Sequence, residues 1–289
     1  ADVLEQHLAR IADRDDEIHA FNLVTADVAR EQAAAVDAAV ADGRDPGPLA
    51  GVPVALKDNM CTRGVATTCS SKILEGWEPP YDGTLAETLR QAGAVLVGKT
   101  NLDEFAMGSS TENSAFGPTR NPLDTSRVPG GSSGGSSAAV AAGFAALSFG
   151  SDTGGSIRQP AALCGVVGVK PTYGRVSRYG LVAFASSLDQ IGPFTHSVAD
   201  AALALQAVCG HDPRDSTSIP EPLPDYSAML DRGVEGLRVG RITDLPEGAD
   251  PDFDERREEA LDALGSGGST IFAVYVTALG YVLTAYYMI

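Results

Sequence analysis

Two clusters rich in glycine and serine, at 130–137 and 152–156, flank a short, alanine-rich apolar run at 138–147. The neighbouring segments have the character of strands and helices, so we expect these clusters to be ordered loops rather than flexible turns. Serines on such loops, with a lysine in an upstream apolar strand at Lys57, can attack a carbonyl carbon without histidine. The sequence therefore predicts an amide-cleaving enzyme.

Segments with helical and strand patterns alternate along the chain, which predicts an α/β fold. Apolar residues recur at helical spacing over 1–42, as expected for two amphipathic helices. Further helices are predicted at 82–92, 136–149 and 198–208, buried strands at 52–58, 94–98 and 163–169, and a further strand at 237–242. An ordered loop is predicted at 105–121 and an exposed connection at 212–225.

The formal net charge is −17, which would repel a nucleic-acid backbone, so we expect any RNA to be held by another chain. The only lysines are Lys57, Lys72, Lys99 and Lys170, beside many arginines and acids. This bias is typical of proteins adapted to high salt, and equally of a GC-rich genome. The four cysteines lack zinc-ligand spacing, which favours buried free thiols and predicts no metal site.

The two ends of the chain bear on its location. Residues 1–14 lack the long apolar core of a signal peptide, which predicts a cytoplasmic protein. Residues 271–289 contain no charge and approach the length of a membrane span. Hydroxyl-bearing residues and the absence of a basic flank favour a core element over a membrane segment, and we expect no membrane association.

The proposed chemistry needs a nucleophile, a base and donors for an oxyanion. Ser156 follows two glycines, so the backbone N–H groups of Gly154, Gly155 and Ser156 are open to a substrate oxygen. Burial can lower the pKa of a lysine by several units, and the apolar strand before Lys57 supplies such burial. The alternative for Lys57 is an exposed strand-end lysine that pairs with Asp58.

Other motif interpretations are weaker. Residues 131–135 match G-x-S-x-G, with Ser133 as nucleophile and His196 or His211 as base, but that motif requires a strand directly before it. Residues 124–129 have a loop composition instead. The phosphate-binding motif G-x-x-x-x-G-K-[ST] and the acylase motif S-x-x-K are both absent from the sequence.

Three stretches resemble the amidase signature family: GVPVALKDN at 51–59, PGGSSGGS at 129–136 and SDTGGSIRQPA at 151–161. The resemblance implies an amidase signature fold, with a mixed central β-sheet covered by helices on both sides. It also implies one domain over 1–289, with a helical segment at 1–48, a catalytic core at 49–264 and an atypical apolar tail at 265–289. Family sequences continue beyond residue 289, so the domain is expected to be incomplete at its C-terminus.

The resemblance also implies roles for individual residues. Ser156 would be the acyl-forming nucleophile, Ser132 a bridging serine beside a cis peptide bond, and Lys57 the base that takes the proton through Ser132. The oxyanion hole would be lined by Thr153, Gly154 and Gly155. The substrate pocket would be flanked by Met107, Gly108 and Ser109.

Within the family, 103–113 and 170–181 are similar to the branch that hydrolyses glutamine for tRNA-dependent transamidation. This resemblance implies ammonia release for misacylated Glu-tRNA(Gln) or Asp-tRNA(Asn), with companion subunits B and C. No cofactor is expected in this chain, while a partner would use ATP and magnesium and would hold the tRNA. Residues that grip the α-groups of glutamine would lie beyond residue 289. Two alternatives remain: a stand-alone amidase for small amides, and an inactive assembly subunit.

Overall fold

The computed structural model describes residues 1–243, 245, 250–276 and 281. The chain divides into two units, Ala1–Tyr226 and Ser227–Ile289. The first contains every candidate catalytic residue named above. The expectation of a single domain over 1–289 stays a prediction.

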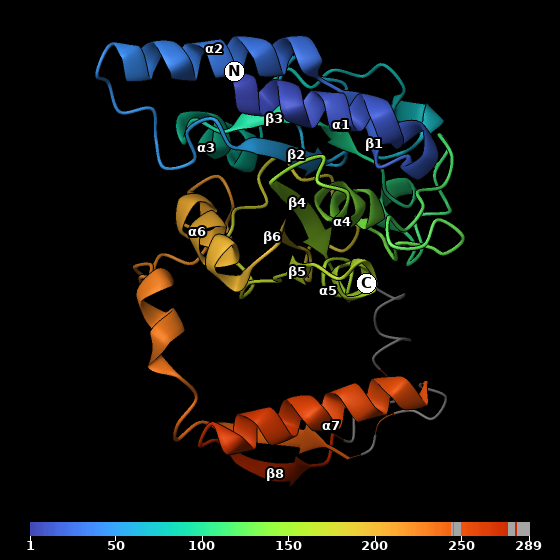
Figure 1. Cartoon of the computed structure of the whole chain (residues 1–289), viewed down its shortest axis with the longest axis vertical. Coiled ribbons are helices and arrows are strands. Elements are labelled where there is room, and N and C mark those ends of the chain that lie inside the picture. The colour runs from blue at the N-terminus through green and yellow to red at the C-terminus, as the bar shows by residue number, and fades with distance from the viewer. Residues whose placement is uncertain (244, 246–249, 277–280, 282–289) are drawn as a thin grey trace. The chain divides into compact units, whose positions relative to one another are not determined.

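The first unit is built on a sheet of six strands: β1 Phe21–Val24, β2 Pro53–Lys57, β3 Val95–Thr100, β4 Leu147–Asp152, β5 Val167–Gly168 and β6 Gln190–Thr195. Their order in the sheet is β1-β3-β2-β4-β6-β5 (Figure 1). β2 is parallel to β3 and β4, and the remaining pairs are antiparallel. The sheet is therefore mixed, as predicted, and the loops after β2 and β4 leave it at the same edge.

Helices cover both faces of this sheet, which also confirms the prediction. They are α1 Asp2–Ile18, α2 Ala26–Ala41, α3 Thr84–Gln91, α4 Gly134–Ala141, α5 Arg158–Cys164 and α6 Val198–Val208. One apolar cluster joins Ala55 of β2 to α1, α2 and α4. Another joins Val54 and Leu56 of the same strand to α3 and α6. Successive residues of a strand point to opposite faces, so this completely buried strand has a helical layer on each side.

Lys57 and Lys99 lie on opposite faces of the sheet. A register shift early in the β2–β3 pair aligns Leu56 with Lys99 and Lys57 with Thr100. Aligned residues of adjacent strands share a face, so Lys57 faces the same layer as Thr100. The Thr100 hydroxyl lies 2.6 Å from the Ser136 hydroxyl, which places that layer at α4.

Two predicted elements differ from the structure. The helix predicted at 136–149 is wrong in its second half, because α4 ends at Ala141 and β4 begins at Leu147. Gly143 adopts a left-handed conformation with φ of 70°, which turns the chain out of the helix. The strand predicted at 163–169 is mostly wrong, because α5 extends to Cys164 and Gly165 ends it with φ of 67°. The sequence patterns also missed β1, α5 and β6.

The second unit contains η3 Ser227–Arg232, β7 Arg238–Ile242, α7 Pro251–Ser266 and β8 Thr270–Val274. β7 and β8 are parallel neighbours connected through α7, so they form a β-α-β unit. The strand predicted at 237–242 is confirmed, whereas α7 and β8 were not predicted. Of the uncharged tail, 271–274 belongs to β8, and 277–280 and 282–289 lie outside the described residues.

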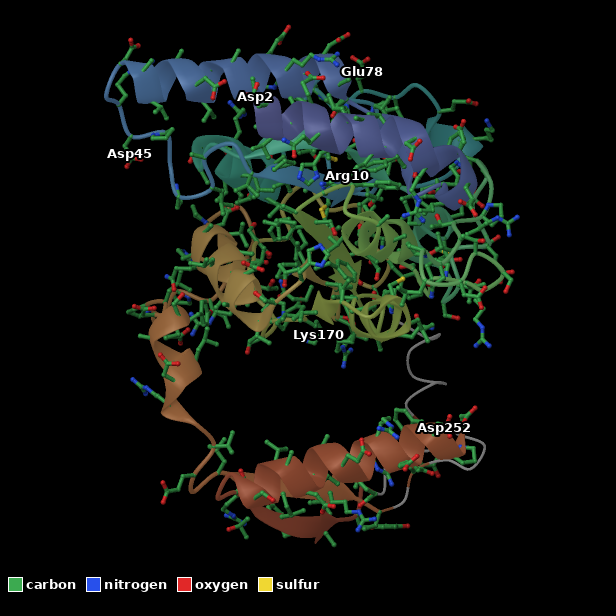
Figure 2. All side chains as sticks on the ribbon, in the orientation of Figure 1. Asp2, Arg10, Asp45, Glu78, Lys170 and Asp252 are labelled. Carbon is green, nitrogen blue, oxygen red and sulfur yellow. The ribbon has the colours of Figure 1, made fainter. Side chains whose placement is uncertain are left out.

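The charged residues differ widely in burial. Figure 2 labels Asp2, Asp45 and Glu78, all of which are exposed. Lys57 and Lys99 are fully buried. All four cysteines are buried free thiols, which confirms the interpretation of their spacing. In the described ranges, no helix is both long and apolar enough to span a membrane.

Candidate active site

Lys57 is the last residue of β2, and its amine ends in a cluster of serine hydroxyls. Lys57 Nζ lies 2.7 Å from Ser132 Oγ, 2.9 Å from Ser133 Oγ and 3.0 Å from Ser151 Oγ. Ser132 and Ser133 come directly before α4, and Ser151 belongs to β4. The side chain of Lys57 has no exposed surface. The structure therefore excludes an exposed strand-end lysine and brings the predicted base to the predicted bridging serine.

The surroundings of Lys57 allow its amine to lose a proton near pH 7. Burial lowers the pKa of Lys57 to about 7, although the charges of Asp103, Asp189 and Asp152 oppose part of this shift. All three carboxylates are buried. Within the described part of the chain, the amine forms its hydrogen bonds with hydroxyls and with the Ser151 carbonyl rather than with a carboxylate. Such a group can accept a proton at neutral pH.

The hydrogen bonds are consistent with a proton donated by Ser132 to the amine. A neutral amine has two N–H donors and one lone pair. The Ser133 hydroxyl donates to the Ser151 carbonyl at 3.0 Å, so towards the amine it acts as an acceptor. Ser151 Oγ also receives a hydrogen bond from Asn59 Nδ2 at 3.1 Å. Ser132 Oγ has no other partner among the residues that the structure describes, so its proton is free to face the lone pair. The Gly131–Ser132 peptide bond is cis, as the resemblance implied.

Ser156 lies on the loop that connects β4 to α5. Only 6% of its surface is exposed, and its carbonyl accepts a hydrogen bond from Ser133 N at 3.2 Å. Backbone contact therefore joins the segment of the predicted nucleophile to the segment of Ser132. Gly154, two residues earlier, is exposed, so the loop is open to a ligand from outside.

Asp152, at the end of β4, fixes this loop. Its carboxylate accepts from the backbone N–H of Gly155 at 2.8 Å and of Ile157 at 3.0 Å. It also receives two hydrogen bonds from the Arg158 guanidinium at 2.9 and 3.1 Å. Burial alone would raise the pKa of Asp152, but the hydrogen bonds from Arg158, Ile157 and Gly155 keep the pKa below its usual value. The Gly155 N–H is therefore already engaged by Asp152.

The predicted pocket loop is attached to the same centre. Met107, Gly108 and Ser109 are all exposed. The loop is anchored by buried Asp103, whose carboxylate accepts from Thr111 N at 3.0 Å and whose own N–H donates to the Ser132 carbonyl at 3.3 Å. A Cβ atom on Gly131 would lie 2.7 Å from Ser110 N. The loop therefore packs against the peptide bond that precedes Ser132.

The alternative nucleophile, Ser133, lacks the geometry of a nucleophile elbow. Residues 125–133 form turns and loop rather than a strand. Within the described residues, the hydroxyl of Ser133 pairs with Lys57 and Ser151, and neither His196 nor His211 is among its partners. The described ranges also contain no cluster of three or more His, Cys, Asp or Glu side chains suited to a metal ion.

Sequence reasoning missed several residues of this centre. Ser151 and Asn59 contact the amine cluster, and Asp103 and Asp152 hold its loops. Ser151, Asn59, Asp103 and Asp152 all fall within the stretches that carry the family resemblance. That overlap was the available signal, but the residue types alone do not separate these four from ordinary loop residues.

This centre of one buried lysine and clustered serines agrees with the comparison of the whole chain with known proteins. The family model described as Amidase matches residues 2–289, and the chain therefore belongs to the amidase family. It is 59% identical over 286 residues to the A subunit of a glutamyl-tRNA(Gln) amidotransferase from Synechococcus sp. (strain RCC307). That match covers 99% of this chain and 59% of the relative, so the chain spans about three fifths of the relative's length.

Solved structures agree with this family membership. The A subunit of the glutamyl-tRNA(Gln) amidotransferase from Thermotoga maritima matches with a TM-score of 0.88 and 46% identity, over 99% of this chain and 61% of that one. Peptide amidase from Stenotrophomonas maltophilia matches with a TM-score of 0.90 and 39% identity, over 99% of this chain and 60% of that one. These matches confirm the predicted amidase signature fold.

Proposed function

We propose that the chain is an amide hydrolase in which Ser156 is the nucleophile, Ser132 relays a proton and Lys57 is the base. The observation that carries this proposal is the fully buried amine of Lys57, 2.7 Å from Ser132 Oγ. A base that is uncharged near neutral pH and in contact with a hydroxyl is what serine attack on an amide needs.

The proton would move in two linked steps. Ser156 Oγ attacks the amide carbon while its proton passes to Ser132 Oγ, and the proton of Ser132 passes to Lys57 Nζ. When the C–N bond breaks, the protonated Lys57 returns the proton through Ser132 to the leaving nitrogen. Water then attacks the ester on Ser156 by the same route, which releases the acid and regenerates the hydroxyl.

The negative charge that develops on the substrate oxygen would be held by the loop after β4. Thr153, Gly154 and Gly155 line this oxyanion site, with the Thr153 and Gly154 N–H groups as donors beside that of Ser156. Asp152 supports the proposal because it fixes the loop in place before substrate arrives. Met107, Gly108 and Ser109 would flank the substrate on the other side.

We further propose that the substrate is glutamine and that the ammonia serves transamidation of Glu-tRNA(Gln) or Asp-tRNA(Asn). The names of the amidotransferase relatives support this choice. The protein would act in the cytoplasm with subunits B and C, and a partner would bind the tRNA and use ATP and Mg²⁺. The strongly acidic composition supports leaving the tRNA to that partner.

A glutaminase assay of the chain with and without subunits B and C, at low and at high salt, tests this function. Ser156→Ala should abolish ammonia release from glutamine, and full turnover by that variant would refute the assignment. The salt series also distinguishes adaptation to high salt from a GC-rich genome as the source of the composition, because only the adaptation predicts greater activity and stability as salt increases.

A stand-alone amidase remains the second candidate, because the chain is also similar to a peptide amidase. Hydrolysis of simple amides at full rate without companion subunits would favour it. Ammonia release that rises strongly on adding the companions would favour the amidotransferase. Binding to the companion chains without any hydrolysis would instead indicate an assembly role.

A further inference from the structure

Gln159 lies at the point where three segments of the candidate site converge. It is in the first turn of α5, three residues after Ser156. Its Oε1 accepts a hydrogen bond from the backbone N–H of Gly131 at 2.9 Å, and Gly131 is the residue before Ser132. Its Nε2 donates to the Ser109 carbonyl at 3.0 Å, in the predicted pocket loop. Its own backbone N–H donates to the Gly155 carbonyl at 2.8 Å.

The orientation of this amide follows from its partners. A backbone N–H at Gly131 can only donate, and a carbonyl at Ser109 can only accept. Only one orientation of the Gln159 amide satisfies both, with oxygen towards Gly131 and nitrogen towards Ser109. The two halves of one side chain therefore hold two different parts of the site.

We propose that Gln159 is a positioning residue that couples the Met107–Ser109 loop to Ser132 and Ser156. The oxygen and the nitrogen of its side-chain amide have separate tasks. This inference rests on the proposed hydrolysis of amides by Ser156. The oxygen holds the Gly130–Gly131 peptide group, which lies one peptide bond before Ser132, and so affects the chemical step. The nitrogen fixes the loop beside the substrate and so affects substrate binding.

Gln159→Glu separates these tasks. The carboxylate still accepts from Gly131 N, but its second oxygen faces the Ser109 carbonyl without a proton to donate. We expect KM for glutamine to rise by about tenfold, as for a lost and partly repulsive hydrogen bond, while kcat stays within about twofold of the wild-type value. Gln159→Leu removes both contacts, and we expect kcat to fall by about tenfold as well as KM to rise.

Labelling of Ser156 by a small alkyl fluorophosphonate provides a second readout, because this probe needs the serine machinery but not a glutamine-binding loop. Its rate should be unchanged in Gln159→Glu and reduced in Gln159→Leu. Gln6→Glu makes the same change on the exposed surface of α1 and should alter neither measurement. All variants are assayed as the full chain with its companion subunits.

An unchanged KM in Gln159→Glu, or probe labelling slowed as much as in Gln159→Leu, would overturn this inference. A Gln159→Glu protein that fails to fold would also overturn the inference. Gln159 is exposed and glutamate has the same shape, so misfolding would indicate a role in stability rather than in positioning. These outcomes differ from failure of the proposed function, in which wild type would not hydrolyse glutamine or Ser156→Ala would retain full activity.

Discussion

Lys57 and Lys99 are both fully buried and lie on neighbouring parallel strands, but their polar neighbours differ in kind. The amine of Lys57 meets serine hydroxyls. The amine of Lys99 lies 3.4 Å from Asp58 Oδ1 and donates to the Met60 carbonyl at 2.8 Å and to Thr67 Oγ1 at 2.7 Å. The same residue type, equally buried, therefore contacts hydroxyls in one case and a carboxylate in the other.

This difference shows why burial alone does not make a lysine a base. Burial lowers the pKa of Lys99 too, but the nearby charge of Asp58 opposes that shift. The carboxylate of Asp58 is itself fixed by Asn22 at 3.1 Å and by Thr68 N at 3.2 Å. We infer that Lys99 holds the loop around Asp58 through their contact, while Lys57, which faces hydroxyls, is the lysine placed to exchange a proton.

The largest expected effect tests the proposed role of Lys57 as the base. Lys57→Met removes the proposed base but keeps most of the side-chain volume. We expect the rate of amide hydrolysis to fall by about 10³- to 10⁴-fold, the upper range for loss of a general base. Stopped assays of ammonia release measure this loss. A variant that keeps a tenth of the wild-type rate would show that Lys57 is not the base.

Lys99→Met tests the proposed structural role of Lys99. It leaves the buried carboxylate of Asp58 without its counter-ion, so we expect the free energy of unfolding to fall by about 3 to 5 kcal/mol. Denaturant unfolding measures the change. Lys72→Met is the matched control, because Lys72 forms an exposed pair with Glu75 and its loss should cost at most about 1 kcal/mol. Equal losses in the two variants would remove the distinction between the lysines.

Ser151→Ala tests whether the hydroxyl of Ser151 helps to orient the amine of Lys57. It removes one acceptor of the amine and leaves Asn59 Nδ2 without its partner. We expect kcat to fall by about three- to tenfold, because the lone pair of Lys57 is less well directed at Ser132. Ser151→Thr keeps the hydroxyl and should restore most of the rate. If Ser151→Thr were as slow as Ser151→Ala, a role for the hydroxyl would be excluded.

The smallest expected effect concerns pH. Lys57 acts as a base only when neutral, and its pKa is lowered to about 7 by burial, so the rate should rise as pH increases through about 7. Asp103 opposes this lowering, and Asp103→Asn should therefore move the acidic limb of the pH profile to lower pH. We expect the ratio of the rates at pH 6 and pH 9 to increase by about two- to fivefold.

The exposed carboxylate of Asp42 provides the control for this measurement. Asp42→Asn makes the same charge change away from the amine, and the pH profile should not move. Asp103 also anchors Thr111 and Asn113, so Asp103→Asn can lower the rate at every pH. The ratio of the rates at the two pH values is unaffected by such a uniform loss. An acidic limb that moves to higher pH in Asp103→Asn would contradict the proposed electrostatics.

Local patterns predicted the elements whose signal lies within one segment. The strand at Pro53–Lys57 is bounded by a glycine-rich turn and a polar loop, and the helix at Val198–Val208 begins at the N-cap Ser197. The patterns failed where two elements share one apolar run. Residues 136–149 are mostly small or apolar, so their periodicity does not separate the end of α4 from the start of β4.

The candidate site was predictable to the extent that its residues fall within the recognisable stretches. The contact between Lys57 and Ser132 confirms that these two predicted residues meet. The catalytic, oxyanion and pocket roles assigned to individual residues stay predictions. Ser151 and Gln159 could not be assigned any task from the sequence, because their partners lie in other segments and a serine or glutamine has no intrinsic preference for such a position.

The sequence by itself determined the α/β class, the apolar strand that buries Lys57 and the glycine-rich loops that present Ser132 and Ser156. Only the tertiary structure decided which layer each buried lysine faces. The register shift between β2 and β3 aligns Lys57 with Thr100 and sends Lys99 to the opposite face. Side chains alternate along a strand, so this choice depends on the pairing between two strands about forty residues apart, which no local pattern encodes.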